Sequence, residues 1–221
     1  MLYDLIAALM RPSAWWGRLE VAGLGALPAE GPVLVVPNHD SQWDPIVIGL
    51  AAKRRRRLRY LARASLWRFP GLAPILNGLG QIPVRRGAGD AGAIESAAEA
   101  LRNGDAVCVF PEGGLSWGEP KRARGGAGRL AQSCPQARIV CCAVRGATGY
   151  VRWPRRPRVE VSFFEPESGQ QRPGEEPREL AARLLAEVRD RVPPAPAGRR
   201  GRIGPPGRVA RKLEASSASR S

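Results

Sequence analysis

Residues 33–50 read VLVVPNHDSQWDPIVIGL, and they carry the clearest structural signal of this chain. The apolar run Val33–Val36 predicts a buried strand. Asp44 and Pro45 are typical of a helix start, with aspartate at the N-cap and proline at the first helical position. A buried strand that leads into a helix indicates an α/β fold.

His39 is the single histidine of the chain, and it lies just past the predicted strand end. In a parallel α/β sheet, sites lie outside the carboxyl ends of the strands. Asp44 would begin the next helix, close enough to hold one imidazole nitrogen. Two interpretations of this pair stay open: a general base that deprotonates an alcohol, or a helix cap beside a turn histidine. Ser41 lacks the Gly-x-Ser-x-Gly context of a nucleophile, which favours a turn role.

Strand-like and helix-like patterns alternate along the rest of the chain. Helical patterns cover residues 2–10, 91–102 and 177–192, and strand patterns cover 58–61, 81–84, 106–110, 138–144 and 158–164. This alternation predicts an α/β fold with a largely parallel central sheet flanked by helices. We expect an apolar helix within residues 1–16, one domain over 17–193 and a basic, disordered tail over 194–221.

The chain of 221 residues carries a formal net charge of +15. Such a charge favours acidic partners: anionic lipid headgroups, nucleic acid, phosphorylated cofactors or an acidic carrier protein. The densest basic run is Lys53–Arg57, but few aromatic residues are interleaved with it, so nucleic acid is the less favoured partner. Trp15 and Trp16 follow an apolar helix near Arg11, which suits either a membrane interface or packing on the core.

Several classes of protein are disfavoured by composition. The four cysteines show no C-x-x-C spacing and accompany one histidine, so we expect no metal site. No apolar run approaches the roughly 20 residues of a membrane-spanning helix. The N-terminus lacks the basic flank of a secretory signal. We therefore expect a cytoplasmic protein or one that is peripheral to a membrane.

Two further segments carry side chains suited to binding. Residues 80–86 read GQIPVRR, a strand that ends in Arg85 and Arg86 and can aim a guanidinium at a phosphate or carboxylate. Residues 110–116 read FPEGGLS, where Glu112 follows a strand and Gly113 allows the backbone to approach a ligand. Taken singly, each segment is equally an ordinary strand end or tight turn.

In this order and spacing, the three segments and a weaker fourth at 139–146 resemble the glycerolipid acyltransferase family, which includes the 1-acylglycerol-3-phosphate acyltransferases. The resemblance spans residues 17–164. It implies a glycerol-3-phosphate acyltransferase-like fold with a short interfacial N-terminal helix. It also implies transfer of a fatty acyl group from acyl-CoA or acyl-carrier protein to a hydroxyl of a lysophospholipid or related acceptor, as in phospholipid biosynthesis.

The resemblance also assigns roles to residues. His39 would deprotonate the acceptor alcohol, and Asp44 would orient the imidazole, so that the alcohol attacks the thioester without an acyl-enzyme. Arg86 would bind the phosphate of the acceptor, and Glu112 with Gly113 would shape the acceptor site. No metal or cofactor is needed besides the acyl donor. The enzyme would sit on an anionic phospholipid surface at the cytoplasmic face of the membrane.

The chain departs from the family pattern at the acceptor site. Leu115 stands where the family usually carries an arginine that grips the acceptor phosphate. Arg85, Lys121, Arg122 and Arg124 are candidates to compensate, and the other interpretation is an acceptor without glycerol phosphate. Two other functions stay open: a non-catalytic basic module that binds membranes or nucleic acid on a degenerate acyltransferase scaffold, and an esterase or thioesterase that uses water as acceptor.

Overall fold

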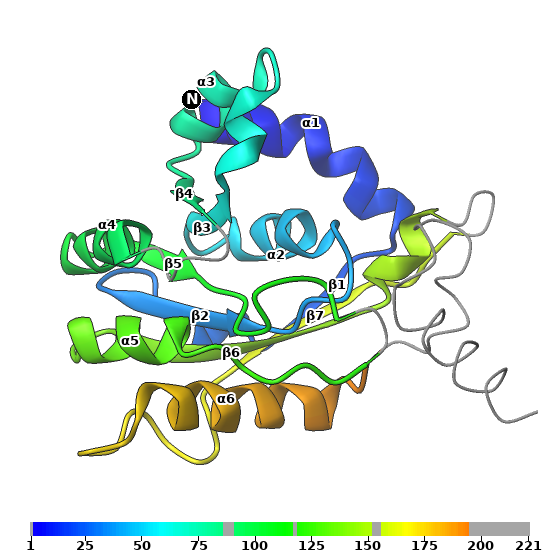
Figure 1. The fold of residues 1–221 in the computed structure, drawn as a ribbon. Helices are drawn as coiled ribbons and strands as arrows, with labels where there is room; N and C mark the ends of the chain where they lie inside the picture. The colour runs from blue at the N-terminus through cyan, green and yellow to red at the C-terminus, as the bar shows by residue number, and fades with distance from the viewer. Residues whose placement is uncertain (1, 86–90, 117–118, 152–155, 195–221) are drawn as a thin grey trace, which may run out of the picture.

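The structure is a computed structural model that describes residues 2–85, 91–116, 119–151 and 156–194 (Figure 1). Its centre is a seven-stranded sheet with the order β1-β7-β6-β2-β5-β3-β4. The strands are β1 (Glu20–Ala22), β2 (Val33–Pro37), β3 (Leu58–Arg63), β4 (Ile82–Val84), β5 (Ala106–Cys108), β6 (Arg138–Arg145) and β7 (Glu160–Phe164). The α-helices are α1 (Leu2–Trp16), α2 (Asp44–Ala52), α3 (Leu72–Gly78), α4 (Ala91–Arg102), α5 (Gly126–Ser133) and α6 (Pro177–Arg191). Three short 3₁₀ helices are η1 (Leu24–Ala26), η2 (Ala64–Arg68) and η3 (Ala147–Val151).

The sheet is largely parallel, as the sequence predicts. Every pairing between described strands is parallel except that of β6 with β7. Strand β2 lies between β5 and β6, and all five of its residues are buried. A parallel strand buried on both faces reads as a continuous apolar run, which is the pattern of residues 33–36.

Two hydrophobic cores lie on opposite faces of the sheet. Leu34 and Val36 of β2 pack in one core with α4, α5 and α6, and Val33 and Val35 pack in the other with α2. This division follows from the alternation of side chains along a strand. Figure 1 shows the resulting layers, with α5 and α6 beneath the sheet and α2 above it, covered in turn by α1 and α3. The close approach of α5 to α6 depends on Gly128, where a Cβ would lie 2.0 Å from the Pro177 carbonyl oxygen.

Several element boundaries differ from those predicted. Helix α4 has the predicted bounds, but α1 runs on past Pro12 to Trp16, and the Ser13 hydroxyl donates to the Met10 carbonyl within that turn. The edge strand β1 and the helices α3 and α5 were not predicted, because they are short and partly exposed. The predicted tail disorder concerns residues that, beyond 194, lie outside the described part of the chain.

Much of the basic run 53–57 is used within the protein. The Arg56 guanidinium donates to the carbonyls of Pro28, Gly31 and Gly104, and so ties together loops at the amino ends of the strands. Arg57 forms an ion pair with Asp4 of α1. The run therefore serves the fold first, and its capacity to bind an external anion is smaller than its length indicates.

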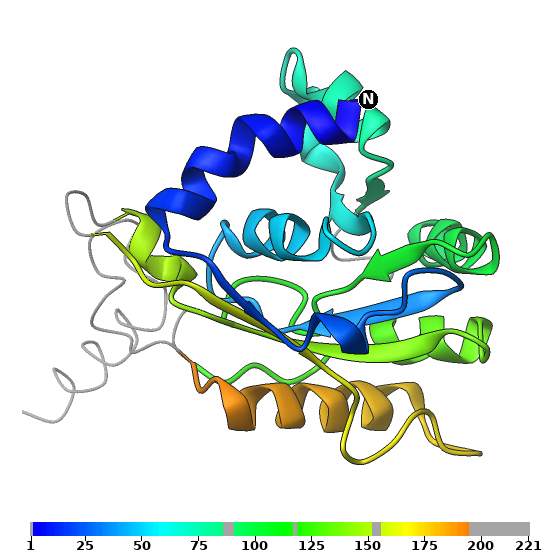
Figure 2. The ribbon, with the colours of Figure 1, turned by 180° about the vertical axis from the view of Figure 1, so that it is seen from behind.

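Helix α1 is held to the domain near both ends. Asp4 pairs with Arg57 and Lys53 near its start, and the Tyr150 hydroxyl donates to the Ser13 carbonyl near its end. Figure 2 shows α1 running from the side of α3 to the start of β1. Among the described residues, no helix is long and apolar enough to cross a bilayer.

Candidate active site

The site lies at the carboxyl edge of the sheet, where β2, β5 and β6 end side by side. His39 follows β2, and Glu112 follows β5. The loop after β2 is fixed by Asn38, whose side-chain amide donates to the Val144 carbonyl at 2.9 Å and accepts from the Val144 N–H at 2.8 Å. This amide prolongs the β2–β6 ladder by one step, so the backbone that carries His39 is anchored before the loop begins.

Asp44 holds both the His39 ring and the loop that carries it. Its Oδ2 lies 3.0 Å from His39 Nδ1 and also accepts the N–H groups of Asp40 at 2.8 Å and Ser41 at 2.7 Å. The predicted N-cap role of Asp44 is therefore wrong in detail. Asp44 is the first helical residue, Trp43 holds the N-cap position, and the carboxylate bonds backward to the loop.

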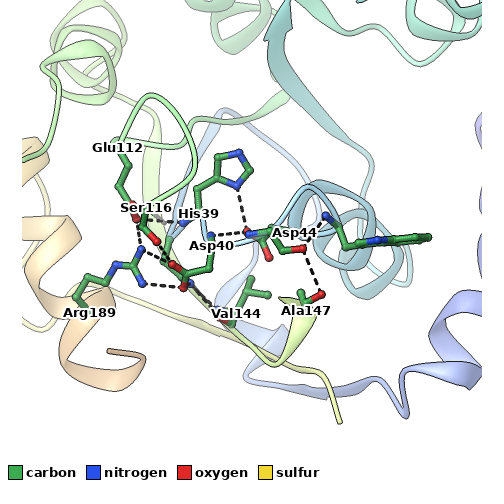
Figure 3. Close-up of polar contacts among 11 residues, drawn as sticks. His39, Asp40, Asp44, Glu112, Ser116, Val144, Ala147 and Arg189 are labelled. Atoms are coloured by element: carbon green, nitrogen blue, oxygen red, sulfur yellow. Dashed lines mark hydrogen bonds and ion pairs between the residues drawn. The ribbon is translucent and has the colours of Figure 1, made fainter. Parts of the chain in front are cut away.

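The Asp44 carboxylate sets the tautomer of His39. An ionised carboxylate only accepts hydrogen bonds, so Nδ1 must carry a proton, and in the neutral imidazole Nε2 then has a free lone pair. Burial of Asp44, which is 1% exposed, raises its pKa, and the hydrogen bonds from His39 and Ser41 oppose that rise. Figure 3 shows the second ring nitrogen directed away from Asp44, with no hydrogen bond to the other residues drawn.

Phe110 forms one wall of the imidazole site. The Phe110 and His39 rings stack with centroids 4.1 Å apart and an interplanar angle of 28°. The His39 side chain is 13% exposed. The imidazole is thus clamped by a ring on one face and a carboxylate at one edge, and it presents Nε2 to an incoming group.

Glu112 holds the backbone of the loop that carries His39. Its Oε1 accepts the His39 backbone N–H at 3.1 Å and also bonds Arg189, and its side chain is fully buried. Burial raises the pKa of Glu112, and the positive charge of Arg189 opposes that rise. The expected contact between Glu112 and an acceptor therefore stays a prediction, since this carboxylate faces the loop.

Gly113 adopts a left-handed conformation with φ of 63°. A Cβ at this position would lie 2.5 Å from Cδ of Arg124, so the exposed Arg124 side chain crosses directly over the turn. The Arg124 N–H also donates to the Pro111 carbonyl at 2.7 Å. Leu115, two residues after Gly113, is buried.

The two arginines after β4 are less well defined. Arg85 is exposed at the carboxyl edge of the sheet, and Arg86 lies outside the described residues.

Ser41 is not placed as a nucleophile, because its hydroxyl donates to the Ala147 carbonyl and accepts the Trp43 N–H. A cavity of about 380 Å³ lies between β4 and α4, lined in part by Gln81 of the 80–86 segment and by Glu99, and neither His39, Asp44 nor Glu112 contributes to it.

The described residues contain no cluster of His, Cys, Asp and Glu side chains suited to a metal ion. All four cysteines are free thiols in the interior, and burial raises the pKa of Cys141 to about 12. These thiols are therefore placed as small core residues, as the apolar sequence around Cys108 and Cys141 predicts.

Sequence reasoning did not find Arg189. This residue lies near the end of α6, and its guanidinium binds both Asp40 and Glu112. Burial lowers the pKa of Arg189, but its bonds to the two carboxylates outweigh that effect and raise it. Arg189 lies within the predicted helix of residues 177–192, and the local sequence carries no signal of its partners.

The chain is an α/β domain in which a partly exposed histidine contacts a buried aspartate, beside a glutamate-bearing turn, at the carboxyl edge of a largely parallel sheet. The profile of the family described as Acyltransferase matches residues 18–145, more than half of the chain. The chain belongs to the acyltransferase family.

Two curated proteins are similar in sequence. A lyso-ornithine lipid O-acyltransferase of Pseudomonas aeruginosa is 32% identical over 145 residues, which cover 62% of this chain and 54% of that protein. An uncharacterised protein of Mycobacterium leprae is 29% identical over 146 residues, which cover 60% of this chain and 37% of that protein. The chain thus spans about half or less of the length of the curated relatives it matches.

A solved structure shares the fold. The crystal structure of PlsC, the 1-acyl-sn-glycerophosphate acyltransferase of Thermotoga maritima, matches with a TM-score of 0.64 and 21% identity. The match covers 86% of this chain and 80% of that one. At this level of identity, the likeness establishes the architecture alone.

Proposed function

We propose that this protein is an O-acyltransferase that moves a fatty acyl group from acyl-CoA or acyl-carrier protein to a hydroxyl of a lysolipid acceptor. The observation that carries the proposal is the His39–Asp44 pair, with its 3.0 Å contact and its unbonded Nε2. Membership of the acyltransferase family and the similarity to a lyso-ornithine lipid O-acyltransferase support it.

The proposed reaction is direct. His39 Nε2 accepts the proton of the acceptor hydroxyl as its oxygen attacks the thioester carbon. The tetrahedral intermediate then collapses, the C–S bond breaks, and the leaving thiolate takes the proton from the imidazolium. Asp44 stabilises the charged ring during this step. Because the thioester is already activated, the reaction requires no enzyme nucleophile, metal or cofactor.

Arg124 is proposed to bind an acidic group of the acceptor. Its side chain crosses Gly113 at the turn that contains Glu112. It therefore places a guanidinium close to the buried Leu115, the position where this chain lacks the arginine of the family pattern. Arg85 and Arg86, at the end of β4, are the proposed second arm. A guanidinium recognises phosphate and carboxylate with the same fork, so both kinds of acceptor are candidates.

An anionic bilayer is the proposed working surface. Exposed apolar side chains of α1 and of the η2–α3 region gather on the outer layer of the molecule, and they are Leu5, Leu9, Trp15 and Phe69, each 60% to 71% exposed. Arg11, Arg63 and Arg68 are exposed in the same segments. An apolar face with neighbouring cations suits an anionic interface. We propose peripheral binding at the cytoplasmic face, where acyl thioesters are supplied.

The test is transfer of labelled acyl groups from acyl-CoA and acyl-carrier protein to a panel of lysolipids with and without phosphate. Free thiol and acylated product are both measured, because a thioesterase releases thiol without product. His39→Gln should reduce transfer by about 10²-fold or more. Gln42→Ala, at an exposed position in the same loop, is the matched control. The absence of transfer in every donor–acceptor combination would favour the non-catalytic binding module.

A further inference from the structure

Arg189 connects the last helix to both motifs of the site. Its Nη1 donates to Asp40 Oδ2 at 2.8 Å, and its Nη2 donates to Asp40 Oδ1 at 3.1 Å and to Glu112 Oε1. Figure 3 shows the guanidinium between the two carboxylates. The side chain of Arg189 is 12% exposed, that of Asp40 is 7% exposed and that of Glu112 is fully buried. Arg189 lies outside residues 18–145, the part of the chain that the family profile matches.

The two carboxylates that Arg189 binds are the residues that hold the backbone of His39. Glu112 accepts the His39 N–H, and Asp40 follows His39 directly and donates its own N–H to Asp44. Ser116 adds to the same unit, since its N–H donates to the His39 carbonyl and its hydroxyl bonds Asp40. A displacement of the guanidinium therefore displaces the His39 backbone on both of its sides.

We propose that Arg189 is a positioning residue for acyl transfer, which fixes the His39 loop through Asp40 and Glu112 and offsets their negative charge beside the catalytic dyad. The proposal rests on the proposed acyltransferase function. Arg189 acts through other residues and contacts neither the reacting atoms nor the thioester. Its planar fork is essential, because one flat group must satisfy both oxygens of Asp40 and one of Glu112.

A purely structural role explains the arrangement less well. Helix α6 already docks through Leu180, Leu184 and Val188, which are fully buried. Buried ion clusters generally add little net stability over apolar replacements of similar size. The geometry thus points to the loop rather than to the docking of α6 as the reason for the cluster.

The local charges make this role measurable. The charged groups that face Arg189 are Asp40, from the loop after β2, and Glu112, from the turn after β5. The charged group that faces the imidazole is Asp44, which in turn interacts with Asp40. Loss of the guanidinium leaves two uncompensated carboxylates near the ring, which favours the protonated imidazole.

The experiment follows the imidazole directly, since His39 is the only histidine of the chain. The full-length protein, purified without a polyhistidine tag, is titrated by NMR, and kcat and KM are measured in parallel. The variants are Arg189→Gln, Arg189→Lys and the double variant Asp40→Asn with Arg189→Gln. The matched control is Arg183→Gln, since Arg183 lies on the same helix and makes a comparably buried ion pair with Glu175, which precedes the helix and lies away from the motifs.

In Arg189→Gln, we expect the imidazole titration midpoint to rise by roughly half a pH unit or more. We expect kcat to fall about ten-fold or more with KM for both substrates nearly unchanged. Arg189→Lys should keep the midpoint near that of the wild type but recover only part of kcat. The double variant should return the midpoint toward the wild-type value, because it restores the net charge. Arg183→Gln should leave both quantities unchanged.

Three results would overturn the proposal. An unchanged midpoint and kcat in Arg189→Gln would show that the residue is dispensable to the site. A loss of kcat matched by Arg183→Gln, with an unshifted midpoint, would indicate a structural role. A selective rise in the acceptor KM would make Arg189 a substrate-binding residue.

If Arg189→Gln does not fold, the double variant and Arg189→Lys carry the same test. If the wild type transfers no acyl group, the proposed function fails, while the NMR titration still decides the role of Arg189.

Discussion

The backbone N–H of His39 donates to Glu112 Oε1 at 3.1 Å, although 73 positions separate the two residues. The two clearest motifs of the sequence are therefore one structural unit. The buried carboxylate of the second holds the backbone of the first, and the Phe110 ring that precedes it stacks on the imidazole. This relationship makes Glu112 a support of the proposed base.

Glu112 is predicted to act on kcat. Glu112→Ala leaves the partly buried His39 N–H without its acceptor, which costs about 1–3 kcal/mol of folding stability. It also loosens the loop that positions the imidazole, so kcat should fall by about ten-fold or more. Glu112→Gln keeps an acceptor oxygen and should retain more activity. Steady-state kinetics with acyl-CoA and a lysolipid measures both variants. A rise in acceptor KM at constant kcat would instead place Glu112 in contact with substrate.

Asp44→Asn should reduce acyl transfer by about 10²–10⁴-fold, because the amide does not reproduce the charge that holds the proton on Nδ1. If its NH₂ group faces the N–H donors of Asp40 and Ser41, those donors lose their acceptor. Thermal unfolding checks that the variant is folded, and Asp190→Asn on the exposed side of α6 is the control. Activity near that of the control would remove Asp44 from the mechanism.

Arg124→Gln should raise KM for a lysolipid that carries a phosphate or carboxylate by about ten-fold, with kcat little changed, because an anion loses a charge-assisted partner. Arg129→Gln, at an exposed position on α5, is the matched control. Acceptor titrations at saturating donor measure the effect. Equal KM values for the two variants would exclude Arg124 from the acceptor site.

Leu5→Glu combined with Leu9→Glu should weaken binding to vesicles that contain anionic phospholipid, since two apolar side chains no longer enter the interface. Val21→Glu, an exposed apolar position on the edge strand β1, is the control. Co-sedimentation with anionic and zwitterionic vesicles at low and moderate salt gives the measurement. Binding that depends on neither lipid charge nor the two leucines would contradict the proposed surface.

The four cysteines should resist thiol reagents in the folded protein at pH 8. Burial raises the pKa of Cys141 to about 12, which keeps it in the thiol form, and the other three are equally enclosed. All four should react at once in denaturant. A rapid reaction of one thiol under native conditions would show local opening of the strand or helix end that carries it.

The fold was predictable because its signals are local. The apolar run of β2, the start of α2 at Asp44 and the periodicity of α4 and α6 each arise within a few residues. The site was partly predictable for the same reason, since His39 and Asp44 lie within one strand–loop–helix unit. Arg86 remains a prediction, because it lies outside the described residues.

The α/β fold, the place of the motifs at the carboxyl edge of the sheet and the pairing of His39 with Asp44 all follow from local sequence. The packing of distant elements sets the remaining contacts: Glu112 faces His39, Arg124 crosses Gly113, Arg189 joins both motifs, and most of the basic run bonds within the protein. Most of these partners lie far apart along the chain, so no local pattern could reveal them. Periodicity states which side of an element is buried, whereas the partner of a buried charge is set only when distant elements pack.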